Sequence, residues 1–402
     1  MADAAEKPSI NGRRLISQLK TLFSLPKTKR TYGFCYGLVF AFVAVTMFLA
    51  FTPSSNRGVS LLLPNFSPSV LKKQGSENLV EKLTDCDLFD GEWVRDESYP
   101  LYEPGSCSII DEQFNCFVNG RPDNDYYKLK WKPIGCSLPR NSVKNQSNVY
   151  EANGRHNFRA EASSSFVFKD YGCTIELFVS PFLVQEWETL DKNGSKKETL
   201  RLDMISKLAD EYRSADILIF NTGHWWTHEK TSKGENYYQE GSHVYTKLNV
   251  LEAFRRALTT WGRWVDANID PMKTMVLFRG YSPSHFSGGQ WNSGGQCHQD
   301  KFIKNETDLS LYLPKLEVLD RVFRGMKTPV SYLNITGMTD YRLDGHPSIY
   351  RKQTLSEEER KTPLMVQDCS HWCLPGVPDS WNELLYAELL RKQENTRRNV
   401  GN

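Results

Sequence analysis

The sequence predicts an α/β protein in which an open, mostly parallel sheet carries helices on both faces. Two observations support this class: short apolar runs recur along the second half of the chain, and segments with helical spacing separate them. Short continuous apolar runs are typical of buried parallel strands, and their alternation with helices is typical of doubly wound sheets. The chain has 402 residues, enough for one large domain or two ordinary ones.

The first part of the chain predicts a membrane anchor. Residues 1–31 are polar and basic, and residues 32–52 are uncharged and long enough to span a bilayer. Positive charge before the apolar run predicts a cytosolic N-terminus and a luminal remainder. A cleaved signal peptide is the alternative, but its apolar core would be shorter. We therefore expect a single-pass signal anchor, followed by a stem over residues 53–84.

The cysteines and glycosylation sequons favour a luminal body. Cys35 lies in the apolar run and eight cysteines follow it, which predicts disulfides whose pairing stays open. Residues 85–140 hold four of these cysteines and are expected to form a small Cys-rich lobe. Sequons occur at Asn145, Asn193, Asn305 and Asn334, with a poorer one at Asn65 because proline follows it.

Residues 141–395 carry the strand and helix signals of the larger domain. Apolar runs on both sides of Lys169–Gly172 predict a hairpin. Leucine, methionine and tyrosine spaced by four residues predict a helix over 198–213. Three buried strands are predicted at 217–220, 275–278 and 330–335, and three helices are predicted after Ser242, over 314–326 and after a cap at Ser380.

The predicted strands bring several loops to one edge of the sheet. Loops beginning at Asn221, Arg279 and Thr336 would share this edge, where sites lie in such folds. The segment from Asp368 to His371 could join them. An acid three residues before a histidine can fix the tautomer of a general base. The alternative is a disulfide-pinned surface loop.

Other residues near this edge are weaker candidates for the site. Asn221, Gly223 and His224 follow a buried strand, where they could supply oxyanion-hole or acceptor contacts. A strand-ending turn is the alternative for Asn221 and Gly223. Arg279 is a candidate for binding a uronate or a donor anion, with a surface ion pair as the alternative.

Composition and spacing argue against nucleic acid and metal. The formal net charge is only +2, and no long basic face is interleaved with aromatic residues. His224 and His228 are four residues apart, but they lack the third ligand of a zinc site. Cys369, His371 and Cys373 could be taken for a metal knot, but disulfides are expected in an oxidising lumen. We therefore expect no metal.

Five stretches carry long and specific motifs. They are Cys86–Trp93, Asn221–Trp226, Phe278–Tyr281, Ser284–Asn292 and Asp368–Asp379. Together they resemble the plant trichome birefringence-like family, which is similar to GDS(L)-type esterases with an SGNH-like α/β/α fold. The resemblance implies a Golgi type II membrane protein that transfers acetyl groups to xylan- or pectin-type wall polysaccharides. It implies no bound cofactor, and it leaves the acetyl donor (acetyl-CoA or another) and the oligomeric state open.

The resemblance also implies a catalytic serine in a Gly-Asp-Ser motif and an Asp-x-x-His motif near the end of the domain. The second motif matches Asp368 and His371, but the chain contains no Gly-Asp-Ser. The family's pattern is intact up to Arg140 and resumes at about Val143, so a segment with the first strand is missing. Ser142 lies at this junction but lacks the Gly-Asp context.

The missing segment leads to two expectations. A neighbouring strand should have an open edge, and a luminal cysteine such as Cys107 should lack its partner. A base without its serine retains only the residual effects of binding and oxyanion stabilisation. Two functions therefore stay open: an O-acetyltransferase with a Ser-His-Asp mechanism, and a non-catalytic protein that binds polysaccharide or a partner enzyme. A hydrolytic esterase is a third alternative.

Overall fold

The computed structural model describes residues 82–140, 149–151, 163–190, 194–298, 303–362 and 367–401. The predicted tail, membrane anchor and nearly all of the stem lie outside these residues, as do Ser142, Asn65, Asn145 and Asn193. Within these ranges, no helix combines the length and apolar character needed to cross a membrane.

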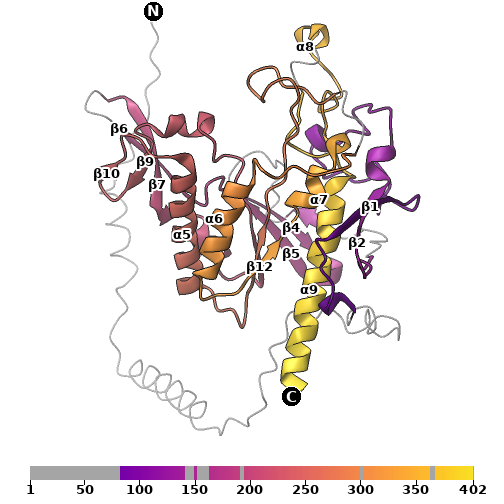
Figure 1. Cartoon of the computed structure of the whole chain (residues 1–402), viewed down its shortest axis with the longest axis horizontal. Coiled ribbons are helices and arrows are strands. Elements are labelled where there is room, and N and C mark those ends of the chain that lie inside the picture. The colour runs from indigo at the N-terminus through magenta and orange to yellow at the C-terminus, as the bar shows by residue number, and fades with distance from the viewer. Residues whose placement is uncertain are drawn as a thin grey trace, which may run out of the picture. The chain divides into compact units, whose positions relative to one another are not determined.

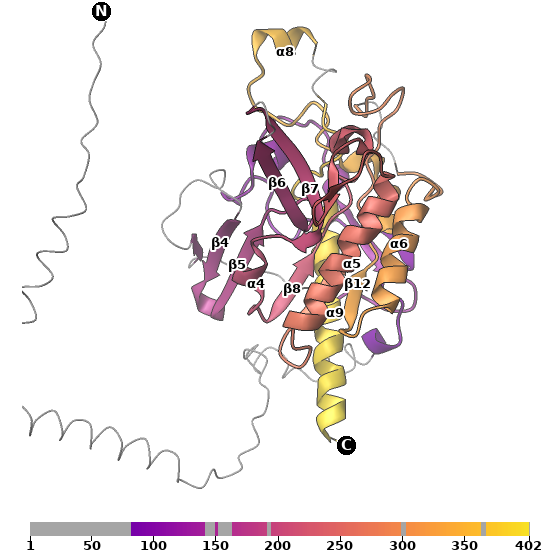
Figure 2. The ribbon, with the colours of Figure 1, turned by 90° about the vertical axis from the view of Figure 1, so that its left-hand side faces the viewer.

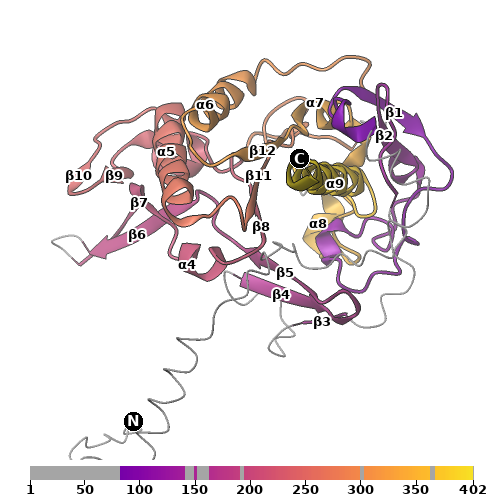
Figure 3. The same cartoon turned by 90° about the horizontal axis from the view of Figure 1, so that it is seen from below.

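A parallel sheet of three strands lies at the centre of the described part (Figure 3). Its order is β12-β11-β8, and Val276 of β11 lies opposite Leu218 on one side and Val330 on the other. The three predicted parallel strands are therefore confirmed. They are β8 (Ile217–Phe220), β11 (Met275–Arg279) and β12 (Val330–Leu333).

Helices cover both faces of this sheet, as predicted (Figure 3). Helix α5 (Val250–Asn268) begins after Asn249, whose side chain accepts hydrogen bonds from the backbone N–H groups of the first turn. It lies with α6 (Leu313–Arg324) on one face, and α9 (Val377–Gly401) lies on the other. The helix predicted after Ser242 thus starts several residues later.

Alternation along β11 explains why both faces need a helix. Phe278 packs into the cluster that contains Trp261 of α5, whereas Leu277 packs into the cluster that contains Leu384 of α9. Phe278 and Leu277 are both fully buried. Successive side chains of a strand point to opposite faces, so a strand that is apolar at every position must be covered on both sides.

The prediction of a helix over residues 198–213 is wrong. Residues 196–205 form a strand instead, and only α4 (Ala209–Tyr212) is helical. Leu200 and Leu202 are buried while Asp203 is exposed. Residues four apart also share one face of a strand, so the spacing fits both structures. This mixed sheet has the order β10-β9-β7-β6, with β6 (Val184–Leu190), β7 (Lys196–Ile205), β9 (Tyr238–Glu240) and β10 (His243–Val244).

The predicted hairpin is confirmed, and its two strands lie side by side (Figure 2). Phe168 lies opposite Cys173 across the turn, which the short helix η4 (Lys169–Tyr171) forms. The three strands of this antiparallel sheet are β3 (Val149–Glu151), β4 (Ser163–Phe168) and β5 (Cys173–Phe178).

Residues 82–140 form an antiparallel strand pair and short turns beside α9 (Figure 1). Trp131 is buried in the same cluster as Leu277 and Leu384, so this segment shares a core with the parallel sheet. Cys86 and Cys136 form a disulfide within it. Its elements are β1 (Gly91–Arg95), η1 (Glu112–Phe114), η2 (Asp125–Tyr127) and β2 (Leu129–Pro133).

Ser380 does not cap the last helix as predicted. Helix α9 begins at Val377, and Ser380 lies buried inside it. The carboxylate of Asp379 instead accepts a hydrogen bond from the backbone N–H of Gly376. The remaining short helices are η5 (Glu229–Gly234), α7 (Thr336–Asp340), η6 (Leu343–Gly345) and α8 (Glu357–Lys361).

The outer edge of β8 is open within the described ranges, as expected from the missing segment. β8 ends the strand order of the parallel sheet. Its residue Ile219 is 47% exposed, although Leu218 and Phe220 are buried beside it. Cys107 forms no disulfide, which agrees with the loss of its expected partner, and Cys173 is free as well.

Candidate functional site

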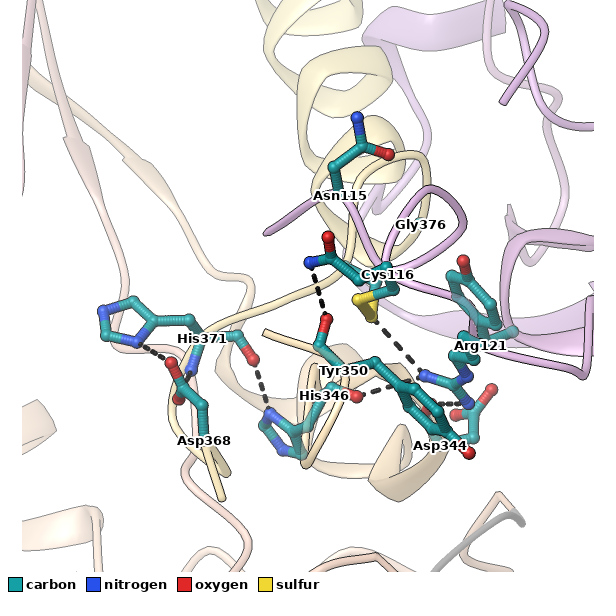
Figure 4. Close-up of a disulfide and its surroundings, with 12 residues drawn as sticks. Asn115, Cys116, Arg121, Asp344, His346, Tyr350, Asp368, His371 and Gly376 are labelled. Atoms are coloured by element: carbon teal, nitrogen blue, oxygen red, sulfur yellow. Dashed lines mark hydrogen bonds and ion pairs between the residues drawn. A yellow bond between two sulfur atoms is a disulfide. The ribbon is translucent and has the colours of Figure 1, made fainter. Parts of the chain in front are cut away.

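Asp368 and His371 lie in direct contact in the loop before α9 (Figure 4). Nδ1 of His371 lies 2.8 Å from Oδ2 of Asp368. The other carboxylate oxygen, Oδ1, accepts hydrogen bonds of 3.0 Å from the backbone N–H groups of Ser370 and His371. The Asp368 side chain is 6% exposed, whereas the His371 side chain is 59% exposed. The carboxylate is therefore held inside the loop and the imidazole faces solvent.

This geometry suits the histidine for proton transfer. Burial alone would raise the pKa of Asp368, but the hydrogen bond and charge of His371 outweigh it and hold the pKa well below its usual value. The carboxylate stays ionised and accepts the Nδ1–H of His371. The lone pair of Nε2 is then free to accept a proton from a bound hydroxyl, as a general base must.

Two disulfides fix the loop that carries this dyad. Cys369 bonds to Cys297, and Cys373 bonds to Cys116. The cysteines on both sides of His371 are thus tied to distant parts of the chain, and they are not arranged as a metal knot. No group of three or more His, Cys, Asp or Glu in the described ranges is arranged to hold a metal ion.

A chain of buried histidines supports the loop from behind. Nδ1 of His346 lies 2.7 Å from the backbone oxygen of His371 (Figure 4). Nε2 of His346 lies 2.7 Å from Nδ1 of His285, whose Nε2 lies 3.3 Å from Oδ1 of Asp340. Both rings are buried, and the ring of Trp372 packs 4.1 Å from that of His346.

Hydrogen bonds join the two buried histidines into a continuous link. A carbonyl oxygen only accepts, so Nδ1 of His346 donates to it. One proton lies between Nε2 of His346 and Nδ1 of His285. Burial lowers the pKa of His346 to about 3, and the neighbouring His285 contributes in the same direction. The two rings therefore connect Asp340 to the backbone of the loop that carries the dyad.

His224 lies near the dyad, but its ring is committed to other contacts. Its Nε2 donates to the backbone oxygen of Ser282 at 2.8 Å, and its ring stacks on Tyr281 at 4.1 Å. Burial lowers the pKa of His224 to about 3. The positive charges of Arg279, Lys315 and His371 contribute to this lowering, so these three groups lie close enough to influence the pKa of His224. His224 is a neutral, positioned ring.

Asn221 and Gly223 behave mainly as parts of the turn after β8. Gly223 has φ +149°, and a Cβ there would lie 2.8 Å from Cδ2 of Tyr281. Its carbonyl oxygen accepts a hydrogen bond of 3.0 Å from Nζ of Lys315. Asn221 is exposed. The close packing explains why glycine is needed at 223, and an oxyanion role for either residue stays a prediction.

Arg279 has no acidic partner in the part of the chain that the structure describes. Its guanidinium lies 5.0 Å from the ring centre of Trp381, and its Nη1 is buried without a hydrogen bond. Burial lowers the pKa of Arg279 to about 10. The surface ion pair that was the alternative is therefore not formed within the described ranges, and the guanidinium stays buried without an acidic partner.

Comparison with known proteins places these features in a family. The GDSL/SGNH-like acyl-esterase family found in Pmr5 and Cas1p matches residues 128–388, and the PMR5 N-terminal domain matches residues 84–137. Trichome birefringence of Arabidopsis thaliana is 62% identical over 356 residues, covering 80% of this chain and 59% of that protein. Trichome birefringence-like 1 from Arabidopsis thaliana is 62% identical over 357 residues, covering 80% and 64%.

A third relative, trichome birefringence-like 4 of Arabidopsis thaliana, is 44% identical over 375 residues, covering 84% of this chain and 82% of that protein. The chain itself spans only 59% and 64% of the length of the first two relatives.

The alignment with trichome birefringence also bears on the missing segment. The alignment has 356 positions. The aligned part of this chain is 80% of its 402 residues, and this part contains fewer than 356 residues. Some aligned positions of the relative thus have no residue here, which supports an internal deletion. The family match and the motifs agree across more than half of the chain, so the protein belongs to the GDSL/SGNH-like acyl-esterase family found in Pmr5 and Cas1p.

Proposed function

We propose that this site evolved for acetyl transfer to a plant cell-wall polysaccharide, with a xylan- or pectin-type glycan as the acceptor, and that the chain as given retains glycan binding without the transfer. The observation that carries the proposal is the pair formed by Asp368 and His371, a buried carboxylate that orients a solvent-facing base. Membership of an acyl-esterase family supports acyl chemistry at this base.

The complete reaction would run through a covalent acyl-serine. A serine hydroxyl would attack the acetyl donor, and His371 would take the hydroxyl proton and pass it to the departing group. A sugar hydroxyl would then lose its proton to Nε2 of His371 and attack the acetyl carbonyl. The bond to serine would break, and His371 would return the proton to the serine oxygen.

The chain as given contains the general base of this route but lacks the Gly-Asp-Ser motif of the nucleophile. No hydroxyl or thiol of the described residues forms a hydrogen bond with Nε2 of His371, and no Gly-Asp-Ser motif occurs in the sequence. This polypeptide therefore binds its glycan, or a partner enzyme, without completing the covalent route. Full-length relatives that contain the serine would carry out the transfer.

The Golgi lumen is the proposed location, with residues 32–52 as a single-pass type II anchor. Support comes from the basic residues before that apolar run and from the three disulfides, which form in oxidising compartments. Asn305 and Asn334, which head two sequons, are exposed in the structure and accessible to glycosylation.

The test uses the purified luminal chain with acetyl-CoA and oligosaccharides of xylan or pectin. We expect glycan binding, measured by calorimetry, and no acetyl ester on the glycan by mass spectrometry. His371→Ala should leave binding unchanged, and His243→Ala, at an exposed position in β10, is the matched control.

Three outcomes would change the proposal. Acetyl transfer that disappears in His371→Ala and survives in His243→Ala would show that this chain is an active transferase. Release of acetate from an acetylated glycan would favour a hydrolytic esterase. Absence of both glycan binding and transfer would refute a role with wall polysaccharide.

A further inference from the structure

A lysine contacts two exposed tryptophans near the carboxyl-terminal ends of β8 and β11. Nζ of Lys230 lies 4.8 Å from the ring centre of Trp225 and 5.6 Å from that of Trp291. The two indoles are 48% and 53% exposed. Trp225 is held in place by the edge of Phe182, whose ring centre is 6.1 Å away. Exposed, positioned indoles offer flat apolar surfaces with a polar N–H, which suit the faces of sugar rings.

A second lysine extends this group toward the dyad. Nζ of Lys315, in the first turn of α6, donates to the carbonyl of Gly223 and lies 5.1 Å from the ring centre of Tyr281. Burial and the charge of Lys230 lower the pKa of Lys315 to about 8. Lys315 contacts the carbonyl of Gly223 and Lys230 lies over the ring of Trp225, two residues later, so the two ammonium groups border the same turn, and both lysines are partly buried.

Neither lysine is neutralised by the described residues. No Asp or Glu in those ranges forms an ion pair with Lys230 or Lys315, and the same is true of Arg279. Lys315 contacts the ring of Tyr281, and the backbone N–H of His285, four residues later, donates to the carbonyl of Cys369 at 3.0 Å, so this group and the dyad loop border the same segment. Partly buried cations without acidic partners are stabilised when an anion binds between them.

We propose that Lys230, Lys315, Trp225 and Trp291 form an acidic-glycan site, in which the lysines bind a uronate carboxylate and the indoles contact the sugar rings. The inference rests on the proposed function, because it names the acceptor of the same site as a carboxylate-bearing polysaccharide. The carboxylate would occupy the space between the two ammonium groups, and Arg279 would add positive potential. A hydroxyl of a neighbouring sugar would then lie toward Nε2 of His371.

Galacturonan and glucuronic-acid-substituted xylan both present such a carboxylate. The experiment therefore measures the binding of three oligosaccharides of equal length to the purified luminal chain by calorimetry: oligogalacturonide, glucuronoxylan oligosaccharide and unsubstituted xylan oligosaccharide. We expect at least one acidic ligand to bind about tenfold more tightly than the neutral one, since a charge-assisted hydrogen bond has a strength of this order. Binding of that ligand should weaken as the salt concentration rises.

Variants connect this preference to the named residues. Lys230→Gln and Lys315→Gln should each reduce the preference for the acidic ligand about tenfold. Trp291→Ala should lower the affinity for all three oligosaccharides. Lys273→Gln is the matched control. Lys273 is an exposed lysine just before β11, so it lies at the amino-terminal ends of the strands, away from the proposed site. Thermal unfolding of each variant establishes that it is folded.

Several results would overturn the inference. Equal affinity for acidic and neutral oligosaccharides would do so, as would unchanged binding in both lysine variants. Displacement of the acidic ligand by inorganic phosphate at equal concentration would instead assign the lysines to a phosphate-containing donor. Glycan binding without a preference for acidic ligands would overturn this inference and leave the proposed function intact. An acidic-glycan preference without transfer in any chain would support this site and refute the acetyl-transfer proposal.

Discussion

Two disulfides hold the loop that carries His371, whereas the outer edge of β8 has no partner strand among the described residues. Cys297–Cys369 and Cys116–Cys373 join the loop to segments 72 and 257 residues away. At the β8 edge, Ile219 is half-exposed, and β8 has no neighbouring strand on its outer side within the described ranges. These regions correspond to the base half and the nucleophile half of one expected active site.

The difference shows why a deletion can remove one half of a site and leave the other in place. Every contact that fixes the base comes from outside the missing segment: the two disulfides, the carboxylate of Asp368 and the ring of His346. The β8 edge has no such cross-links among the described residues, and no strand covers it there. Cys107 forms no disulfide either, in line with the expectation that the missing segment held its partner.

The largest expected effect comes from removing a disulfide of the loop. The double substitution Cys116→Ser with Cys373→Ser should lower the free energy of unfolding by about 2–5 kcal/mol, because the cross-link closes a long loop of chain. Denaturant unfolding of the oxidised protein measures it. The control is Cys107→Ser, expected within about 0.5 kcal/mol of wild type because this thiol is free. Equal losses in both would mean that Cys107 is disulfide-bonded, and the contrast between the regions would weaken.

The two regions also differ in how much of them the sequence could predict. The runs at 217–220 and 275–278 are short, continuous and apolar, so the strands were predictable, and the spacing of Asp368 and His371 placed both side chains on one turn. The spacing of apolar residues over 198–213 led to the wrong prediction of a helix, because residues four apart lie on one face of a strand as well as of a helix.

The support behind the base could not be predicted because it depends on contacts between distant residues. His285 and His346 are 61 residues apart and meet only through the fold. The short helix η6 ends at Gly345, directly before His346, but the local sequence carries no information about which ring nitrogen of His346 faces a carbonyl. Lys230 lies in η5 and Lys315 lies in α6, far away in the sequence, so their shared environment is visible only in three dimensions.

A smaller effect should follow from neutralising the carboxylate of the dyad. Asp368→Asn should lower the free energy of unfolding near pH 7 by about 1.5–3 kcal/mol, because a buried, charge-assisted hydrogen bond is lost. The folded-state pKa of Asp368 lies below the ordinary aspartate value of 3.8. The stabilisation is therefore complete above about pH 4 and is lost as pH falls through the folded pKa.

Urea unfolding of wild type and Asp368→Asn across pH 2–7 tests this sign. The two curves should converge at low pH and separate above about pH 4. Asp320→Asn, which removes an exposed carboxylate paired with Arg324, is the matched control and should change stability by less than about 1 kcal/mol. A constant offset between wild type and Asp368→Asn at every pH would show that the carboxylate is not held ionised by the loop.

The smallest effect is expected at the open edge. Ile219→Thr keeps a β-branched side chain and should change the free energy of unfolding by no more than about 0.5 kcal/mol, because this side chain is half-exposed. Leu277→Ala, in the adjacent strand β11, should cost about 2–5 kcal/mol because Leu277 is fully buried. If Ile219→Thr proved as costly as Leu277→Ala, another part of the protein or a partner would have to cover the β8 edge. The nucleophile half of the site would then be closed in solution, and the contrast with the disulfide-held loop would rest on the missing serine alone.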